Sequence, residues 1–172
     1  MRSIYRIVIP GVALLITLAI YYSFVPEKRG GKKEGILNPE EVEVKLYVPS
    51  EEESLRIKRL SVKKPKTYQE MANLIVEKLK ENGVIEEETR LLHFAKGGDG
   101  TIYLDFSKDF LYGIDESSEM VKVYSVVNTF LSNFWGAKRV QILIEGEALY
   151  TVGGLLYTYL PLKFNEELLE EE

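Results

Sequence analysis

The hydrophobic pattern of the chain changes sharply after its first 25 residues. Residues 7–25 (IVIPGVALLITLAIYYSFV) form a run of 19 positions without a charged side chain. At about 1.5 Å per residue, a helix of that length nearly matches a hydrocarbon core of about 30 Å. Bulky residues lie where a signal-peptide cleavage site needs small ones. We therefore predict a short tail at residues 1–6 and an uncleaved transmembrane anchor over residues 7–25.

A polar stretch separates this anchor from the rest of the chain. Residues 26–40 (PEKRGGKKEGILNPE) are rich in glycine, proline and charge, which predicts a flexible basic linker. Basic side chains lie on both sides of the apolar run, with Arg2 and Arg6 before it and four Lys or Arg in the linker. Charge alone therefore does not decide which side of the membrane the following domain faces.

From residue 41 onward the pattern is that of a globular domain. Apolar residues alternate with polar ones over residues 42–48, which predicts a half-buried strand. A second strand is predicted over residues 55–62, where the apolar positions shift phase by one residue. We interpret that shift as a β-bulge near residues 59–60.

Two helices are predicted from apolar stripes with helical spacing. The first begins after Thr67, where Glu70 completes a capping box, and it ends at Asn82. The second runs from about Ser117 to Phe134. Its apolar stripe is wider, so we expect it to be the more buried of the two helices.

Three short strands complete the pattern, at residues 91–94, 102–106 and 140–144. A tight turn is predicted at residues 97–100, between the first two of them. The resulting order ββαββαβ predicts an α+β domain over residues 41–164, with two helices packed on one mixed sheet. The remaining residues, 165–172 (NEELLEEE), are predicted to be an acidic tail that frays.

Composition narrows the chemistry that the chain can perform. Its 172 residues include no cysteine and one histidine, and 22 Lys+Arg against 27 Asp+Glu give a net charge of −5. The lack of cysteine excludes disulfides, thiolate catalysis, Cys-ligated zinc and iron–sulfur clusters. The negative balance disfavours a nucleic-acid binder that works by bulk charge. The sequence identifies no orienting partner for the single imidazole, that of His93.

Partial motifs elsewhere do not specify a site. Residues 105–116 follow the spacing of a calcium loop, but Phe110 occupies the position where that loop needs glycine. The glycines of residues 97–100 match neither phosphate-binding motif and predict a hairpin turn. Glu145 and Glu147 are typical of carboxylates in a turn. We therefore predict no catalytic residue, no cofactor and no metal site.

One cluster of charge has two open interpretations. Six cations lie within eleven residues: Arg56, Lys58, Arg59, Lys63, Lys64 and Lys66. Alternation places Arg56 and Lys58 on the solvent face of the second strand. The cluster is either a charged edge strand that blocks sheet-to-sheet aggregation, or a docking patch for an anionic wall polymer or an acidic partner.

Three segments together resemble the GerMN domain family, named after the sporulation and spore germination protein GerM. They are VKLYVP (44–49), GTIYLDFSKDF (100–110) and SEMVKVYSVVNTFLSNFWGAKRVQILIEGE (118–147). Within the third, the family pattern corresponds to residues 127–130 (VNTF) in the helix, 136–138 (GAK), and 140–146 (VQILIEG) in the strand. The resemblance covers roughly residues 42–163.

This resemblance implies a compact extracytoplasmic α+β module held at the membrane by a lipid or a helix. Its topology is similar to that of the ring-building modules of sporulation secretion complexes. Family members are associated with envelope assembly or cell-wall metabolism, and the resemblance supplies no catalytic residues. Many members are lipoproteins and some have two tandem modules, whereas this chain has no cysteine and room for one module.

We therefore predict a single-pass protein of the cell membrane whose extracytoplasmic domain is not an enzyme. It would act as a scaffold or assembly factor in an envelope protein complex, related to sporulation and germination or to the cell wall, and further copies of itself are candidate members. The alternative is a peptidoglycan-binding module that tethers or guides a murein hydrolase.

Overall fold

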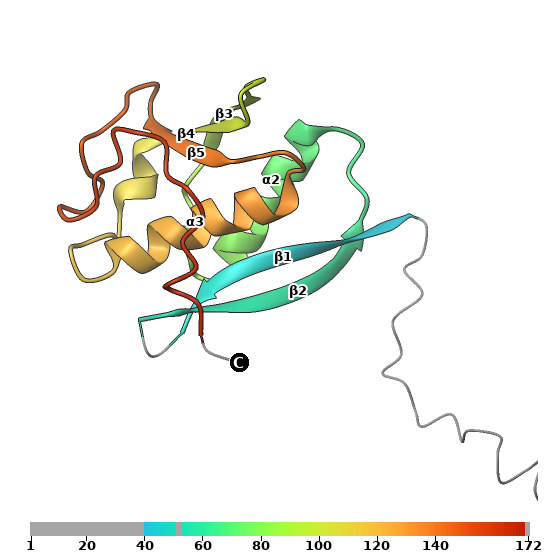
Figure 1. Cartoon of the computed structure of the whole chain (residues 1–172), viewed down its shortest axis with the longest axis horizontal. Helices are drawn as coiled ribbons and strands as arrows, with labels where there is room; N and C mark the ends of the chain where they lie inside the picture. The colour runs from blue at the N-terminus through green and yellow to red at the C-terminus, as the bar shows by residue number, and fades with distance from the viewer. Residues whose placement is uncertain (1–39, 51–52, 171–172) are drawn as a thin grey trace, which may run out of the picture. The chain divides into compact units, whose positions relative to one another are not determined.

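The computed structural model describes residues 40–50 and 53–170 (Figure 1). The predicted tail, the predicted anchor and all of the predicted linker except Glu40 lie outside the described residues. Within residues 40–50 and 53–170, no helix is both long and apolar enough to cross a membrane.

The described chain opens with a β-hairpin. β1 (Glu41–Pro49) and β2 (Leu55–Lys63) pair antiparallel along their whole length, from Glu41 opposite Lys63 to Pro49 opposite Leu55. Both predicted strands are confirmed. The register runs without a shift, so the predicted bulge near residues 59–60 is wrong.

The phase shift in β2 arises because the hairpin is covered on both faces. Leu60 and Leu55 lie on opposite faces of a regular strand. Leu60 lies opposite Val44 and packs against the main core, whereas Leu55 belongs to a second, smaller hydrophobic cluster. The two ends of β2 therefore turn apolar side chains to different neighbours, without an extra residue.

Both predicted helices are present. α2 (Tyr68–Glu81) begins after Thr67, whose hydroxyl accepts the N–H of Glu70 at 3.1 Å. The Glu70 carboxylate accepts the N–H of Lys66 at 2.7 Å, one residue before its partner in a standard capping box. α3 (Glu119–Asn133) buries nine of its residues against four in α2, so the prediction that it is the more buried helix is confirmed.

The remaining strands form a mixed sheet of three. They are β3 (Leu91–Lys96), β4 (Thr101–Phe106) and β5 (Arg139–Ile144). β4 lies in the middle, antiparallel to β3 and parallel to β5. The turn at residues 97–100 closes where the N–H of Gly97 donates to the Thr101 carbonyl at 2.7 Å. A short 3-10 helix, η1 (Lys108–Leu111), follows β4, and the predicted order ββαββαβ is confirmed.

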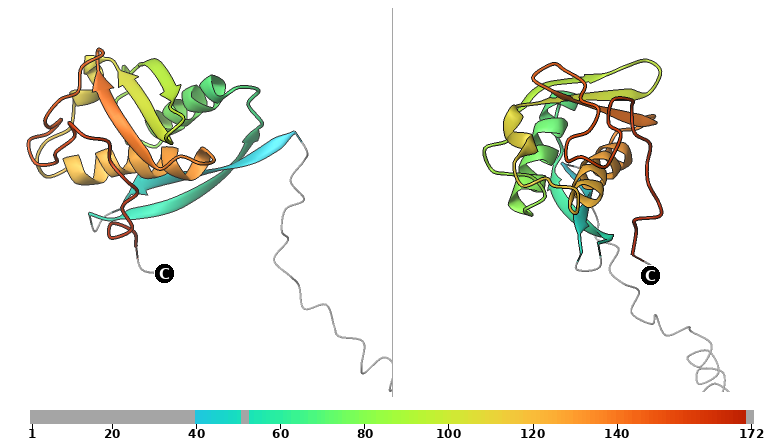
Figure 2. Two further views of the ribbon diagram at one scale, coloured as in Figure 1. Left: turned by 45° about the horizontal axis from the view of Figure 1, so that its top comes forward. Right: turned by 90° about the vertical axis from the view of Figure 1, so that its left-hand side faces the viewer.

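The domain has three layers. Figures 1 and 2 show α2 and α3 lying between the β1–β2 hairpin and the sheet of β3, β4 and β5. The α+β class is confirmed, but the prediction that both helices pack on one sheet is wrong, because the strands form two separate sheets.

The sheets stay separate because α3 occupies the edge of β1 that faces away from β2. The N–H of Tyr47 donates to the Thr129 hydroxyl at 3.0 Å, and the N–H of Lys45 donates to the Asn133 side chain at 3.0 Å. The Asn133 amide in turn donates to the Lys45 carbonyl at 2.7 Å. Side chains of a helix thus provide the hydrogen bonds that a third strand would otherwise make.

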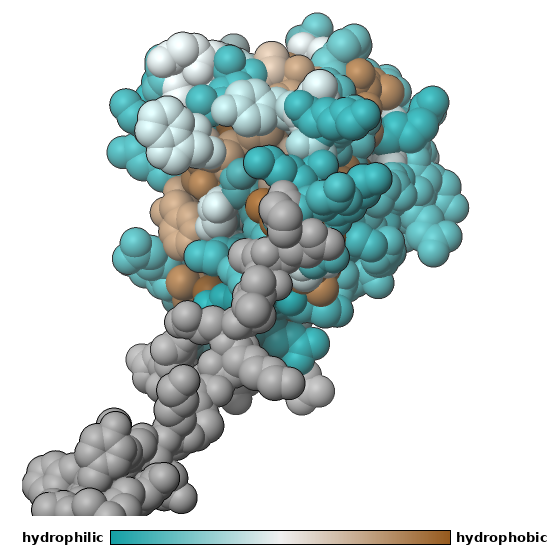
Figure 3. Space-filling model, turned by 90° about the vertical axis from the view of Figure 1, so that its right-hand side faces the viewer, coloured by the Kyte–Doolittle hydropathy of each residue, from teal (hydrophilic) through white to brown (hydrophobic). Residues whose placement is uncertain are grey.

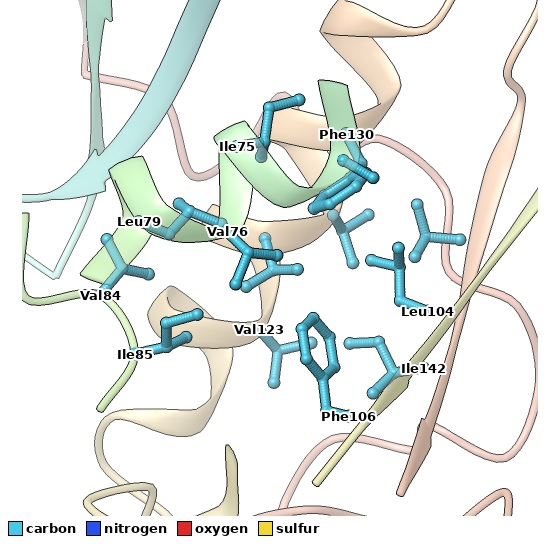
Figure 4. Packing of buried hydrophobic residues seen from close by; sticks show 14 of the residues in the cluster. Ile75, Val76, Leu79, Val84, Ile85, Leu104, Phe106, Val123, Phe130 and Ile142 are labelled. Atoms are coloured by element: carbon cyan, nitrogen blue, oxygen red, sulfur yellow. The ribbon is translucent and has the colours of Figure 1, made fainter. Parts of the chain in front are cut away.

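The main core lies between the layers. Figure 4 shows that side chains of α2, among them Ile75 and Val76, belong to one cluster with Phe130 of α3 and Leu104 of β4. Phe106 at the end of β4 is fully buried and stacks on Phe110 of η1, with ring centroids 4.6 Å apart.

The carboxyl-terminal segment is attached to the hairpin. The N–H of Leu55 donates to the Leu168 carbonyl at 2.6 Å, and the N–H of Glu170 donates to the Leu55 carbonyl at 3.1 Å. Leu168 and Leu169 pack in the second cluster with Leu55 and Tyr47. The prediction that this tail frays is wrong for residues 165–170, because two leucines within the acidic sequence bind it to the domain.

Candidate functional site

The segment that follows β5 folds around one buried carboxylate. Glu119, the first residue of α3, is fully buried. Its carboxylate accepts hydrogen bonds at 2.6–2.9 Å from five donors: the Thr151 hydroxyl and the N–H groups of Val152, Gly153, Leu155 and Leu156. We call residues 149–160 the tyrosine loop.

These bonds set the charge state of the buried group. Burial by itself would raise the pKa of Glu119, because a low-dielectric surrounding disfavours the charged form. The hydrogen bonds from the Thr151 hydroxyl and the backbone N–H groups outweigh burial and hold the pKa below its ordinary value. Glu119 is therefore ionised at neutral pH, and an ionised carboxylate can accept all five bonds.

The glycine pair in the tyrosine loop permits this close approach. A Cβ at Gly153 would lie 2.8 Å from the Glu119 Cβ and 3.0 Å from the Asp115 carbonyl oxygen. Gly154 has a φ of +114°, a backbone conformation that side chains rarely adopt. Both positions therefore need glycine for the loop to surround Glu119.

The base of the tyrosine loop is also bonded to the domain. The N–H and hydroxyl of Thr158 donate to the carbonyls of Tyr150 and Leu149, at 2.9 and 3.0 Å. The Gln141 side chain of β5 donates to the Thr158 carbonyl at 3.1 Å. The loop is thus held at its base and at its centre.

This rigid loop presents three exposed tyrosines, which we call the tyrosine surface: Tyr150, Tyr157 and Tyr159, exposed by 69%, 51% and 44%. The rings of Tyr150 and Tyr159 stack with centroids 4.9 Å apart, and Tyr157 lies within 6.3 Å of both. Leu155 and Leu160 of the same loop are also exposed. A grouped set of exposed aromatic and aliphatic side chains is typical of a binding surface.

The six predicted basic site residues are exposed but do not form one face. Arg56 and Lys58 lie opposite Val48 and Leu46, on the side of the hairpin that faces the core, and Lys58 donates to the Asn82 side chain at the end of α2 at 2.8 Å. Arg59 lies on the other face, 3.9 Å from the Glu43 carboxylate. The remaining three, Lys63, Lys64 and Lys66, lie at or beyond the end of β2. The structure therefore divides the cluster between the two faces of β2 and along its length.

His93 has a partner that the sequence did not identify. It lies opposite Asp105 across β3 and β4, with its Nδ1 3.0 Å from the Asp105 Oδ2. The other Asp105 oxygen accepts the N–H of Gly146 at 2.8 Å. The pair orients an imidazole that is largely exposed, but no hydroxyl in the described part of the chain is bonded to that ring. The contacts thus place Asp105 as a link between β3, β4 and the turn after β5.

The side chains with calcium-loop spacing form hydrogen bonds to different partners and do not converge on one site. Ser107 donates to the Asp109 carboxylate at 2.9 Å, and Asp105 is bonded to His93 and Gly146. Within residues 40–50 and 53–170, no group of three or more His, Asp or Glu side chains could hold a metal ion.

Comparison with known families identifies the fold. The model of the Germane family, described as "Sporulation and spore germination", matches residues 38–150. The chain belongs to the Germane family. The predicted resemblance to GerMN domains is therefore confirmed. Curated proteins give no match to this chain.

Solved structures agree with this Germane fold. The tandem GerMN domains of the sporulation protein GerM from Bacillus subtilis match with a TM-score of 0.56 and 24% identity, covering 70% of this chain and 46% of that one. The first GerMN domain of the same protein matches with a TM-score of 0.51 and 21% identity, covering 73% of this chain and 98% of that one. The chain thus spans less than half of the tandem structure.

The Germane match also shows what sequence reasoning missed. It ends at residue 150, so the tyrosine loop lies almost wholly beyond it. The available signals were the three tyrosines and the glycine pair within YTVGGLLYTY (150–159), together with an acidic residue at the start of α3. None of them alone indicates that the loop closes on Glu119.

Proposed function

We propose that this Germane domain is the extracytoplasmic, non-catalytic part of a membrane-anchored protein, and that it scaffolds a cell-envelope complex through protein contacts. The observation that carries the proposal is the tyrosine surface. Tyrosine is enriched at protein interfaces, because its ring offers a large contact area at low conformational cost and its hydroxyl can still bond. The bonds to Glu119 order the loop before any partner arrives, which reduces the entropy lost on binding.

Family membership supports the cellular setting. The family carries the description "Sporulation and spore germination", and two of the matching solved structures come from a sporulation protein. The apolar run at residues 7–25 supports the anchor, and its position before the domain supports export of the domain.

The tyrosine surface gives the proposal a direct test. In the full-length protein, Tyr150 and Tyr157 are both replaced by serine, and the complex recovered from native membranes after mild cross-linking is sized. Losing two aromatic side chains from the centre of an interface is expected to lower recovery of the complex by about tenfold or more. The matched control is Tyr103→Ser with Tyr112→Ser, since both tyrosines are exposed and lie outside the loop. Equal recovery with both double variants would count against the tyrosine surface.

Binding to peptidoglycan is the second candidate, and the unpaired basic side chains favour it. Within the described residues, no ion pair is formed by Arg56, Lys63, Lys64 or Lys66, so these cations are available to an anionic wall polymer. This candidate predicts that residues 41–172 sediment with purified sacculi in a salt-dependent way. Failure to sediment at low salt would remove it.

A further inference from the structure

The end of the domain where β1 begins and β2 ends carries an unusual density of lysine. Lys63, Lys64 and Lys66 are all exposed. The start of the described chain lies beside them, since the N–H of Lys64 donates to the Glu40 carbonyl at 2.7 Å. Figure 3 views the molecule from this end and shows brown and pale side chains among the hydrophilic ones.

An apolar hollow opens next to these lysines. It has a volume of about 350 Å³, and its apolar lining comes from Val42, Pro65, Tyr68 and Met71. Lys64 and Lys66 line the same hollow. An apolar surface that is flanked by ammonium groups suits a ligand with both an anionic and an apolar part.

The same end carries an exposed indole. Trp135 is 89% exposed, the highest value among the large hydrophobic residues of the described chain. It directly follows Phe134, whose ring lies 5.6 Å from the ring of Tyr68, so the indole and the hollow belong to one end of the molecule. Lys138 is exposed three residues later.

The acidic side chains near these lysines are bound to other groups. The Glu41 carboxylate accepts from the Ser61 hydroxyl, and the Glu70 carboxylate accepts from the backbone N–H of Lys66. Asp99 pairs with Arg139 at 2.7 Å. Within residues 40–50 and 53–170, the ammonium groups of Lys63, Lys64, Lys66 and Lys138 form no ion pair.

We propose that this basic–aromatic end is a membrane-docking surface that rests on anionic lipid headgroups. It consists of Lys63, Lys64, Lys66, Tyr68, Trp135 and Lys138. Lysines attract the phosphates of an anionic leaflet, and Trp and Tyr rings favour the interface between headgroups and hydrocarbon. The apolar hollow receives the region of the lipid just below the phosphate.

The position at which the predicted anchor joins the domain favours lipid, rather than a distant partner, as the ligand of this surface. The inference rests on the membrane anchor of the proposed function, because residues 26–40 then join the membrane to β1 at this same end. Attachment at this end favours a lipid ligand for the basic–aromatic end over one for the opposite end of the hairpin.

The sole tryptophan of the sequence is a reporter placed in the surface itself. The full-length protein is reconstituted in nanodiscs of phosphatidylcholine alone and in nanodiscs that also contain phosphatidylglycerol. Trp135 emission is recorded with excitation that tyrosine does not absorb, with and without bromine-labelled lipid as quencher. We expect a blue shift and quenching in the phosphatidylglycerol discs, and a return towards the phosphatidylcholine spectrum at high salt.

Matched variants test the electrostatic part of the surface. Replacing Lys63, Lys64 and Lys66 with glutamine removes three cations, each contributing about fivefold to membrane affinity, so the blue shift should be lost. Replacing Arg56, Lys58 and Arg59 with glutamine removes three cations of β2 that lie outside the proposed surface, and it should leave the shift unchanged. Circular dichroism of both variants checks that they are folded.

The outcomes separate this inference from the proposed anchor. A chain that does not insert into either nanodisc contradicts the anchor. A chain that inserts but shows the same Trp135 emission in both lipids overturns the docking surface. A lysine variant that keeps its blue shift but loses the cross-linked complex assigns these lysines to an acidic protein partner and also overturns it.

Discussion

At the scale of single residues, Glu119 organises the loop that follows β5. A buried carboxylate is costly unless hydrogen bonds replace its hydration, and here five donors from one loop do so. The same bonds position the backbone that carries Tyr150, Tyr157 and Tyr159. The order of the tyrosine surface therefore depends on a side chain that no partner can contact.

Glu119→Gln tests this dependence. The amide keeps the shape of the carboxylate but directs an NH₂ group at backbone N–H donors, which leaves buried donors unpaired. We expect a loss of about 2–4 kcal/mol in the free energy of unfolding, measured by urea denaturation, and faster amide exchange at Gly153, Leu155 and Leu156. The control Glu147→Gln, at an exposed carboxylate, should change stability by less than about 0.5 kcal/mol.

The pH dependence follows from the direction of the Glu119 pKa. A folded-state pKa below the ordinary value of 4.5 adds stability that is fully present above about pH 4.5 and is lost as the pH falls through the lower folded-state value. The stability gap between the native chain and Glu119→Gln should therefore be constant near neutral pH and narrow in acid. A gap that does not change with pH would contradict an ionised Glu119.

At the scale of elements, the α3 side chains that bond to β1 replace a strand. Thr129→Val removes the hydroxyl that accepts the Tyr47 N–H and should cost about 1–3 kcal/mol in urea denaturation, since a buried donor is left unpaired. Ser125 is the matched control on the same helix, because within the described residues its buried hydroxyl has no partner. Ser125→Ala should be neutral or slightly stabilising. Equal losses in the two variants would mean that the hydroxyl bond to β1 is not what stabilises this edge.

The helices and strands were predicted well, because the signals for each of them come from residues close together in the sequence. Thr67 begins α2 as its capping pattern indicates, and alternation located the strands. Strand partners were not predictable in the same way, since alternation states which side of a strand is buried but not what buries it. Leu55 shows this: its neighbour is Leu168, more than a hundred residues later, and the phase shift was therefore misread as a bulge.

The candidate site was harder to predict than the fold for a related reason. Four of the five donors to Glu119 are backbone N–H groups, which every loop possesses and no motif records. The contact between His93 and Asp105 depends on the pairing of β3 with β4, whose register is regular from Lys96 opposite Ile102 to His93 opposite Asp105. Both sites arise from tertiary geometry, whereas the basic residues of β2 were visible because charge is a property of the sequence itself.

At the scale of the whole molecule, the last described residues close the domain on the face of the hairpin away from the main core. Leu168 and Leu169 cover Leu55 and Tyr47, and the Asn128 side chain exchanges hydrogen bonds with the backbone of Asn165 at 2.8 and 3.0 Å. The β1–β2 hairpin and the segment of residues 165–170 therefore support each other, although the acidic composition of that segment is typical of a disordered end.

Replacing Leu168 and Leu169 with serine tests whether this closure is cooperative with the core. The two leucines are half-buried, so their loss should cost about 2–3 kcal/mol in urea denaturation and speed amide exchange at Leu55 and Glu170. Glu166→Ser with Glu167→Ser changes the charge of the same segment without touching the cluster, and stability should then change by less than about 0.5 kcal/mol. If both pairs behaved alike, charge rather than apolar burial would attach the segment. If only the leucine pair unfolds the domain earlier, residues 165–170 belong to its folding unit, because β2 needs cover on both faces.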